Sequence, residues 1–444
     1  MKVLFVAAFV LFVTSEFYST RADDEALSLS SAIPDAIHRY VSRPEPKYEW
    51  QKTQKLELDA GNVYQLTLTS QEWHGIVWKH AVEVYEPKKL AHPRHALLFV
   101  NGGSRPGAPD ESDVKLGLKL AQMCGARVVM LHQVPNQPLF GGKKEDDLIT
   151  ETWLKYLETG DDSWPLLFPM VKSAVKAMDA VQELAKAEWD QPVEHFVITG
   201  GSKRGWTSWL TPVVDKRVVA TAPIVIDVLN FRAQMKHQLD TWGEFSEQII
   251  DYSSKGLLKG PNDKETPREV NLRRMMDPWT YREQLSLPKL LIVGTNDPYW
   301  VVDSMNLYWD DLVGDRYIRQ VPNGGHGLEG GRDGALTTLA VFFRHTASGT
   351  DLPRISWDYS HGGLHLKLAM KSDLEPSRVR LWTAHSKDLD FRDDRWESAD
   401  VDCKEGYSVG SVEIPKSGHI AIFGEIEFDF QGLPWSLSTL VYRR

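Results

Sequence analysis

The sequence predicts an α/β fold in which helices cover both faces of a mainly parallel sheet, followed by an all-β domain of the sandwich type. Three patterns support this fold class. Residues 48–86 alternate polar and apolar side chains, as antiparallel strands with one wet face do. From about residue 95, short apolar runs alternate with helical patterns, which is typical of parallel strands buried on both faces. Beyond Pro353, short strand patterns follow one another between turns.

The central segment contains the alternating elements of the parallel sheet. Each apolar run has the length of a strand, and the patterns between the runs have helical spacing. We expect strands at 96–100, 128–131, 196–199, 218–226, 290–293 and 317–321, with helices near 113–124, 167–187 and 335–345. Parallel strands need crossover connections, so these helices should cover both faces of the sheet.

The predicted α/β domain spans residues 23–350 and contains one long interruption. Residues 231–287 form a stretch too long for an ordinary connection and rich in aromatic and charged side chains. We interpret it as an insert that caps the ligand-binding end of the sheet, or alternatively as a helical excursion with a structural role only. Residues 351–444 are predicted to form a small immunoglobulin-like sandwich, with strands at 355–357, 364–368, 379–382, 411–414, 421–426 and 438–442.

Residues 1–22 have the form of a secretory signal peptide. Lys2 precedes a short apolar run, and the small residue Ala22 stands just before an acidic pair. No other apolar run approaches the length of a membrane span. The formal net charge of −10 argues against nucleic acid or an anionic membrane as the main partner. We therefore expect a secreted protein with no membrane span and no nucleic-acid partner.

The cysteines and histidines give no indication of a metal or cofactor. Cys124 lies in an apolar helical pattern that favours a buried free thiol, although secretion would allow a disulfide with Cys403. The spacing of His361 and His365 suits a metal only on a helix, and the surrounding glycines and strand pattern argue against a helix there. We expect no cofactor and no metal.

The segment 195–206 predicts a buried strand, a sharp glycine turn with Ser202 at its apex, and a helix immediately after. This is the layout of a nucleophile elbow, the strained turn that exposes a serine hydroxyl at the edge of an α/β-hydrolase sheet. A serine hydroxyl is a weak nucleophile until a base takes its proton. An acid and a histidine are therefore expected further along the chain.

Both partners follow in the order that α/β-hydrolases use. Asp297 comes directly after a predicted strand, and His326 stands between glycines after the next strand. His326 would act as the base for Ser202, while Asp297 would orient the imidazole. Asp227 is an alternative acid, because it ends the strand that follows the nucleophile and should not be left unpaired.

An oxyanion hole is expected beside the nucleophile. One donor should be the backbone N–H of Lys203, directly after Ser202, and another should come from Gly102 or Gly103 in the loop after the strand at 96–100. Together with Trp206, the side chains of Lys203 and Arg204 are assigned to substrate binding, because two cations at this position could hold an anionic substrate. The alternative is that both are solvated charges at the start of a helix.

The elbow departs from the common GxSxG pattern, because Arg204 stands two residues after the serine and the glycine comes one residue later. The usual small residue lets helix and strand approach each other, so the turn must accommodate the arginine differently. A GxSxxG elbow with a basic residue after the serine is similar to that of glucuronoyl esterases, which act on uronic acid esters and take their acid from an earlier strand. This similarity covers the elbow and the position of Asp227.

A wider resemblance covers most of the chain after residue 22. Five segments carry it: 162–166, 169–174, 199–210, 222–230 and 294–300. Through them the sequence resembles the PhoPQ-activated pathogenicity-related protein family, which includes secreted proteins similar to autocrine proliferation repressor protein A. The resemblance implies an α/β-hydrolase fold and leaves the substrate open.

Two classes of function follow. The first is a secreted serine hydrolase that cleaves a carboxylic ester, with amide or peptide bonds as an alternative; its substrate would be a small-molecule, glycan or peptide ester, with an anionic group as one option. The second is a secreted signalling or binding protein on a hydrolase scaffold, with a cell-surface receptor as its partner. Retention of Ser202, Asp297 and His326 favours the first, since a binding module needs none of them.

Overall fold

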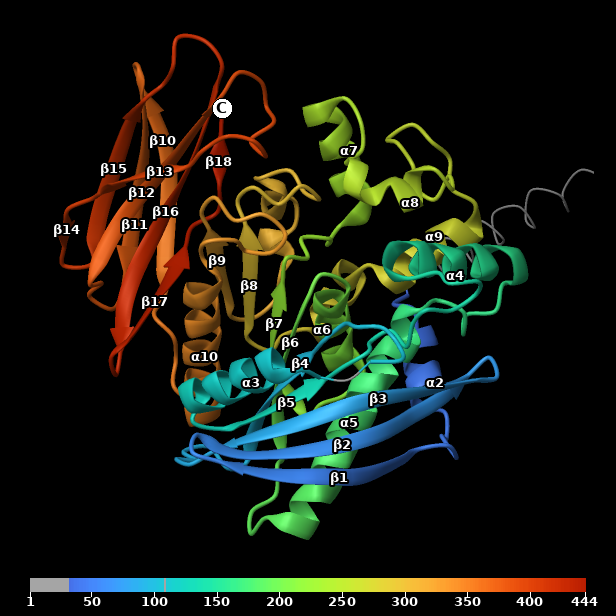
Figure 1. The fold of residues 1–444 in the computed structure, drawn as a ribbon. Coiled ribbons are helices and arrows are strands. Elements are labelled where there is room, and N and C mark those ends of the chain that lie inside the picture. Colours follow the sequence, from blue (N-terminus) through green and yellow to red (C-terminus); the bar gives the residue numbers. More distant parts are fainter. Residues whose placement is uncertain (1–31, 108) are drawn as a thin grey trace, which may run out of the picture. The chain divides into compact units, whose positions relative to one another are not determined.

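The largest sheet of the computed structural model has nine strands (Figure 1). The structure describes residues 32–107 and 109–444, so the predicted signal peptide lies outside the described residues. The strands are β1 (Glu49–Leu58), β2 (Gly61–Trp73), β3 (Ile76–Pro87), β4 (His95–Val100), β5 (Arg127–Leu131), β6 (His195–Gly201), β7 (Val218–Ile224), β8 (Lys289–Gly294) and β9 (Arg316–Val321).

The strand order of this sheet is β1-β2-β3-β5-β4-β6-β7-β8-β9. Strands β1 to β3 are antiparallel, β3 pairs antiparallel with β5, and all pairs from β5 to β9 are parallel. Antiparallel strands at one edge of the sheet are thus followed by parallel strands, and β5 precedes β4 in the sheet although it follows β4 in the chain. This is the arrangement of an α/β-hydrolase. The predicted fold class is confirmed.

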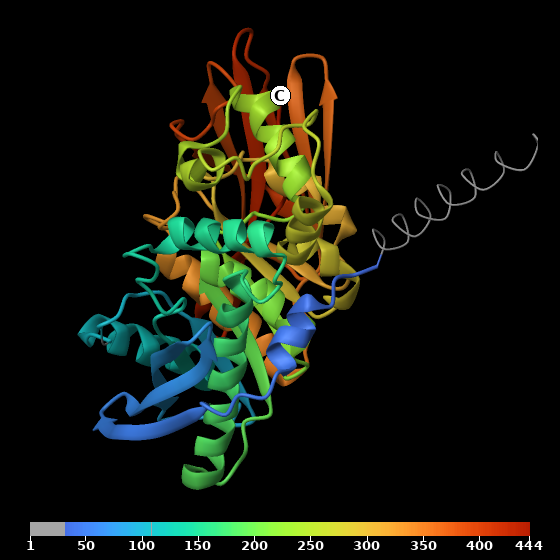
Figure 2. The ribbon, with the colours of Figure 1, turned by 90° about the vertical axis from the view of Figure 1, so that its right-hand side faces the viewer.

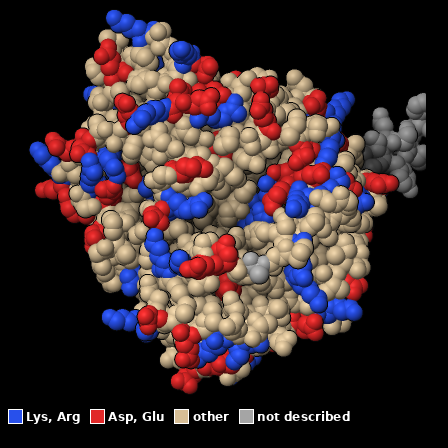
Figure 3. Space-filling view, in the orientation of Figure 1, with Lys and Arg blue, Asp and Glu red and all other residues tan. Residues whose placement is uncertain are grey.

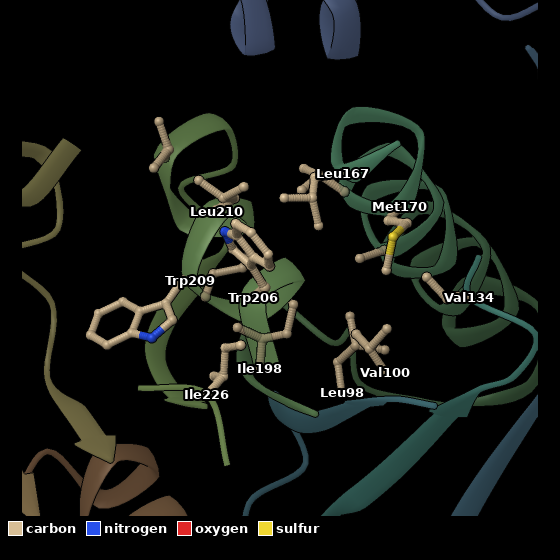
Figure 4. Packing of buried hydrophobic residues seen from close by; sticks show 14 of the residues in the cluster. Leu98, Val100, Val134, Leu167, Met170, Ile198, Trp206, Trp209, Leu210 and Ile226 are labelled. Atoms are coloured by element: carbon tan, nitrogen blue, oxygen red, sulfur yellow. The ribbon is translucent and has the colours of Figure 1, made fainter. Parts of the chain in front are cut away.

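Helices cover both faces of the sheet. On one face α3 (Glu111–Cys124) packs against α10 (Arg332–Ser348), and on the other α5 (Leu167–Glu188) packs against α6 (Lys203–Val214) and α2 (Ala36–Ser42). Neighbouring strand residues point to opposite faces, so Leu97 packs in the core beneath α3 and α10, whereas Leu98 packs beneath α5 and α6. Figure 4 shows Leu98 and Ile198 close to the side chains of α5 and α6.

The sequence analysis missed the helix α4 (Glu145–Thr159). Its buried side chains include Asp146, Thr150 and Thr152, so the apolar periodicity that reveals a surface helix is weak. A second signal was present, because its first turn carries three consecutive acidic residues, which stabilise a helix N-terminus. Four residues of this helix reach the candidate site: Glu145, Asp146, Trp153 and Leu157.

The insert between β7 and β8 is helical. It contains α7 (Phe231–Trp242), α8 (Ile250–Ser253), α9 (Pro267–Met276) and the short 3₁₀ helices η1 (Glu247–Ile249) and η2 (Pro278–Gln284). Figures 1 and 2 both show α7 beside the C-terminal strands, and Arg443 donates from Nη2 to the hydroxyl of Thr241 there (2.8 Å). Two further 3₁₀ helices, η3 (Ser304–Leu307) and η4 (Trp309–Asp311), follow β8.

The C-terminal segment forms two antiparallel sheets, as predicted. One has the order β10-β11-β15-β14 and the other β13-β12-β16-β17, with β18 pairing with β16. Their bounds are β10 (Ile355–Gly362), β11 (His365–Ser372), β12 (Arg378–Ser386), β13 (Glu397–Asp400), β14 (Cys403–Lys404), β15 (Tyr407–Glu413), β16 (His419–Phe430), β17 (Leu433–Ser438) and β18 (Tyr442–Arg443). The prediction of a strand at 438–442 is wrong. β17 ends at Ser438 and β18 begins at Tyr442, so no single strand covers these residues.

The second of these sheets packs against the α/β sheet through β17, which contacts α10 and β9. At this contact Arg319 and Glu425 form a buried ion pair at 2.5 Å. Helix α10 ends at Ser348 and β10 begins at Ile355, on either side of the predicted boundary, and the division into domains 23–350 and 351–444 stays a prediction.

Both cysteines are free thiols, and Cys124 is buried as its helical pattern predicted. Its burial in the core beneath α3 raises the pKa of the thiol. Within residues 32–107 and 109–444, the structure contains no helix that combines the length and the apolar character needed to cross a bilayer.

Candidate active site

Ser202 lies between β6 and α6 with φ 56° and ψ −125°, a conformation that a non-glycine residue rarely adopts. Two hydrogen bonds hold the turn. The Ser202 N–H donates to the carbonyl of Ile224 at the end of β7 (2.8 Å), and the Ser202 carbonyl accepts from the N–H of Trp206 (3.0 Å). The backbone is therefore that of the predicted elbow, with its strain located at the serine.

The glycines on either side of the elbow explain how it tolerates an arginine at the second position after the serine. A Cβ atom on Gly205 would lie 2.6 Å from Cγ2 of Ile226 and 2.8 Å from the carbonyl oxygen of Gly200. A Cβ atom on Gly200 would lie 2.8 Å from the carbonyl oxygen of Val100. The same Cβ atom on Gly200 would lie 2.8 Å from Cβ of Arg204, so helix and strands approach closely at both Arg204 and Gly205, and the glycine at position 200 makes room for the arginine.

His326 and Asp297 are hydrogen-bonded. The Nδ1 atom of His326 lies 2.9 Å from Oδ2 of Asp297, and the other oxygen of Asp297 accepts from the backbone N–H of Tyr299 (3.0 Å). The ring of Tyr299 also packs on the imidazole, with ring centroids 4.3 Å apart. Asp297 is buried and the imidazole is partly exposed, so the Nε2 side of the ring is available for another partner.

The loops that carry the acid and the histidine are in direct contact. Gly294 ends β8, and a Cβ atom there would lie 2.2 Å from the carbonyl oxygen of Gly324. The N–H of Asn296 donates to that same carbonyl (2.9 Å). This packing fixes the distance between Asp297 and His326, and it requires a glycine at position 294.

Asp227, the alternative acid, has other partners. Its two carboxylate oxygens accept hydrogen bonds from the hydroxyls of Ser304 and Tyr308, both at 2.5 Å. Burial raises the pKa of Asp227 to about 6, although these two hydroxyls act in the opposite direction. The structure therefore places Asp297, and not Asp227, against the histidine.

The two predicted sources of oxyanion donors differ in their availability. The N–H of Lys203 opens α6, and the first N–H groups of a helix have no partner within the helix. In the loop after β4, the N–H of Gly102 donates to the side chain of Asn101 (2.9 Å), which leaves the N–H of Gly103 as the better candidate there. Gly103 has φ +107°, a conformation suited to glycine.

Arg204 and Lys203 are both neutralised by α4. The guanidinium of Arg204 binds both carboxylate oxygens of Glu145 at 2.7 Å, and Nζ of Lys203 lies 2.6 Å from Asp146. Burial acts to raise the pKa of Glu145, but the hydrogen bonds and charge of Arg204 lower it to about 2. Both cations therefore have carboxylate partners within the protein, and their predicted role in substrate binding stays a prediction.

The guanidinium of Arg204 packs against the loop after β4, which contains Gly102 and Gly103. A Cβ atom on Gly102 would lie 2.8 Å from Nη2 of Arg204, so the loop rests directly on the guanidinium. The Nε of Arg204 donates to the carbonyl of Val134 in the neighbouring loop. Sequence reasoning missed Glu145 and Asp146 because it missed their helix.

A pocket opens beside Ser202 and His326, with a volume of about 110 Å³ and a mainly apolar wall. Trp206 is part of this wall, and its indole N–H donates to the carbonyl of Met276 (2.7 Å). The predicted placement of Trp206 at the site agrees with this position. Figure 3 shows a hollow near the centre of the face in view, with basic and acidic side chains both present around it.

The chain is similar to known proteins over most of its length. The family model described as PhoPQ-activated pathogenicity-related protein matches residues 37–392. The chain belongs to this family. A curated relative, "Autocrine proliferation repressor protein A" from Dictyostelium discoideum, is 31% identical over 440 residues, which cover 90% of this chain and 87% of that protein. The resemblance inferred from the segments around Ser202 is thereby confirmed.

Solved structures similar to this member of the PhoPQ-activated pathogenicity-related protein family include several esterases and an acylaminoacyl peptidase. Acetyl xylan esterase 1 from Thermoanaerobacterium sp. JW/SL YS485 has a TM-score of 0.49 and 16% identity, covering 73% of this chain and 98% of that one. A glucuronoyl esterase from Solibacter usitatus has a TM-score of 0.41 and 12% identity, covering 75% of this chain and 93% of that one. The fold assignment itself rests on the strand order described above.

Proposed function

We propose that this protein is a secreted serine hydrolase that cleaves carboxylic esters through Ser202, His326 and Asp297. The observation that supports this most is the combination of a strained serine at the β6–α6 turn with a histidine–aspartate pair that borders the same pocket. A protein that only binds a partner has no use for a serine held at φ 56° beside an oriented imidazole.

In the proposed mechanism, Nε2 of His326 takes the proton of the Ser202 hydroxyl as its oxygen attacks the carbonyl carbon of the ester. Asp297 holds Nδ1 of the imidazole and stabilises its protonated form. The oxyanion is bound by the N–H groups of Lys203 and Gly103. His326 returns the proton to the leaving alcohol, and water then attacks the acyl-enzyme with His326 again as the base.

The hydroxyl of Ser202 has no hydrogen-bond partner within the described part of the chain. Among the described residues, the structure therefore shows no hydrogen bond between the Ser202 hydroxyl and His326. Catalytic hydrogen bonds are often long before substrate binds and shorten in the complex. The mechanism requires the Ser202 hydroxyl to turn toward Nε2 of His326 when an ester occupies the pocket.

A fluorophosphonate probe tests the nucleophile directly, because it reacts covalently with activated serines. The mature protein should be labelled, and Ser202→Ala should not be labelled while its thermal unfolding stays unchanged. Hydrolysis of matched nitrophenyl esters and anilides then separates esterase from amidase activity. An unlabelled but folded wild-type protein, beside a labelled control hydrolase, would overturn the proposal.

Secretion is part of the proposal and rests on the sequence of residues 1–22. Expression of the full chain in a eukaryotic host, followed by N-terminal sequencing of protein from the medium, tests it. We expect a mature N-terminus at Asp23. Retention of Met1 in a protein that stays in the cells would contradict secretion.

A second candidate function is signalling, and it is favoured by the curated relative named as an autocrine proliferation repressor. In this case the protein would bind a cell-surface receptor. Purified wild-type protein and Ser202→Ala should be added to growing cells of the source species at equal concentrations. Equal repression by both proteins would assign the effect to binding, whereas repression by the wild type alone would assign it to hydrolysis.

A further inference from the structure

The pocket beside Ser202 is formed largely by the insert. Residues of α7, η1 and the segment after α8 meet side chains of α6 and of the loop after β8 around the pocket. Its apolar wall includes Trp206, Phe231, Met235, Ile249, Leu258 and Trp300. An apolar wall of this kind gains free energy from burying apolar groups of a ligand and offers a polar group little compensation for its lost hydration.

The charged side chains that border the pocket are all in ion pairs. Lys203 lies 2.6 Å from Asp146, and Arg232 and Arg273 bind Glu265 at 2.7 and 2.8 Å. The remaining pair joins Lys259 and Glu269 at 3.0 Å. Separating Lys203 from Asp146, the least exposed of these pairs, would leave an uncompensated charge behind. Arg232 and Arg273 share one carboxylate, and the side chain of Arg232 is 40% exposed, so the preference for a neutral group rests on the apolar wall.

Two hydrogen bonds hold the insert beside the pocket. The side-chain amide of Gln238 donates to the carbonyl of Tyr299 (3.0 Å), and the hydroxyl of Ser246 donates to the carbonyl of Pro298 (2.7 Å). Both bonds attach the insert to the loop that carries Asp297. The insert therefore holds a fixed position next to the proposed triad, and binding requires little ordering of the protein.

A second cavity meets the first at His326. Its volume is about 350 Å³, and it is bordered by Gly102 of the loop after β4, by Gly201 of the elbow and by Arg332 at the start of α10. Val225 and His326 border both cavities. Ser202 borders the first cavity only, so an ester whose carbonyl lies at Ser202 would reach the second cavity past His326.

From these contacts we propose that the enzyme is specific for neutral esters carrying an apolar group, either a medium-length aliphatic chain or a single ring, which binds in the insert-lined pocket. This rests on the proposed function. The volume of about 110 Å³ is on the order of the cavities that accommodate a benzene ring in apolar protein cores. The second cavity receives the more polar part of the ester.

Binding without turnover tests the pocket independently of catalysis. The Ser202→Ala variant is titrated with methyl octanoate, methyl acetate and octanoate while tryptophan fluorescence is recorded, because Trp206 and Trp300 border the pocket. Methyl octanoate should bind at least tenfold more tightly than either of the other two. Equal affinities, or tighter binding of the carboxylate, would overturn the proposal even if the protein proves to be an esterase.

Turnover by the wild type gives the second measurement. Hydrolysis of nitrophenyl acetate first establishes that the protein has esterase activity. In one series of substrates the acyl chain is then lengthened from acetate to octanoate. In a matched series the acyl group stays acetate and the alcohol is lengthened. The value of kcat/KM should rise about fourfold per methylene in one of the two series until the pocket is full. The series that responds identifies which part of the ester enters the pocket, and a nitrophenyl hemisuccinate should be a poorer substrate than the butyrate. Two flat series or a preference for the hemisuccinate would contradict the proposal.

A pair of variants in the insert connects the preference to the pocket. Leu258→Trp fills the pocket, whereas Ile250→Trp adds the same ring to a side chain that is 60% exposed. Leu258→Trp should lower the ratio of kcat/KM for the long substrate to kcat/KM for the acetate at least tenfold, while Ile250→Trp should leave both values within about twofold of the wild type. If Leu258→Trp does not fold, Leu258→Ala replaces it. This variant enlarges the pocket, so the substrate with the highest kcat/KM should become one with a longer or bulkier apolar group. Equal effects of the two tryptophan variants would overturn the assignment.

Discussion

The imidazole of His326 is held from two directions, by a hydrogen bond from Nδ1 to Asp297 at 2.9 Å and by the ring of Tyr299 packed at 4.3 Å between centroids. These contacts come from one loop, because Tyr299 follows Asp297 by two residues and also donates its N–H to the same carboxylate. The imidazole is thereby oriented before any substrate binds. An oriented imidazole whose Nδ1 carries the proton is the form that acts as a base through Nε2.

The first prediction concerns the two aspartates. Asp297→Asn should lower kcat for an ester by about 10⁴, because the histidine loses the partner that selects its tautomer. Asp227→Asn should leave kcat within about fivefold, because both oxygens of Asp227 face Ser304 and Tyr308. Steady-state kinetics with circular dichroism as a folding control measures both. A larger loss in Asp227→Asn than in Asp297→Asn would exchange their roles.

The second prediction concerns the stability of Asp227→Asn relative to the wild type. The difference in the free energy of unfolding should shift in favour of the variant as the pH rises. The pKa of Asp227 is about 6 in the folded protein, above its ordinary value of 3.8. Between these values the folded state holds a proton that the unfolded state has lost, so the wild type loses stability as the pH rises through this window. The asparagine variant has no such loss, so its free energy of unfolding relative to the wild type should rise by about 3 kcal/mol between pH 4 and pH 7, most of it below pH 6.

Urea unfolding of the two proteins at pH 4, 5, 6 and 7.5 measures this difference in the free energy of unfolding. The control is Asp240→Asn, since Asp240 is an exposed residue of α7 paired with Lys236 in the neighbouring turn. Its effect should be small at every pH. An advantage of Asp227→Asn that shrinks as the pH rises would contradict the burial of an uncharged carboxyl.

The third prediction tests the elbow. Gly205→Ala should destabilise the protein by about 1–3 kcal/mol, because the added methyl group meets Ile226 and the backbone of Gly200 below 3.0 Å. Gly201→Ala is the matched control, since a Cβ atom there meets nothing within 4 Å. Thermal unfolding should separate the two variants. Similar melting temperatures would show that helix α6 does not approach the strands as closely as the structure indicates.

The fourth prediction concerns the contact between the C-terminal strands and the α/β sheet. Burial acts to raise the pKa of Glu425, but the charges of Arg319 and Arg380 bring it below its ordinary value. Glu425→Gln should therefore cost about 3–5 kcal/mol of the free energy of unfolding at pH 7, because Arg319 would remain buried without an opposite charge. Glu427→Gln, in a more exposed pair with Arg380, should cost less than about 1 kcal/mol. Equal costs in urea unfolding would mean that the Arg319–Glu425 pair is not buried in solution.

Much of the fold was predictable because it depends on local patterns. The six parallel strands are apolar runs with their own turn residues at each end, and each was placed within a few residues of its observed bounds. Helix α4 was not predicted, because its buried face carries Asp146, Thr150 and Thr152, which have partners only in the folded protein. The strand expected at 438–442 was also wrong, because β17 is the second strand of a hairpin with β16 and ends at Ser438, whereas β18 pairs separately with Ala421 and Ile422 of β16.

The sequence by itself determined the residues of the candidate site and their order, because a glycine turn at Ser202, an aspartate after β8 and a histidine between glycines are visible along the chain. Tertiary structure alone decided which aspartate meets the histidine and what the two cations after the serine do. The hydroxyls of Ser304 and Tyr308 fold over Asp227, and α4 brings two carboxylates to Lys203 and Arg204 from more than fifty residues away. Charges are neutralised by whichever partner packs against them, and that partner is set by the packing of elements far apart in sequence.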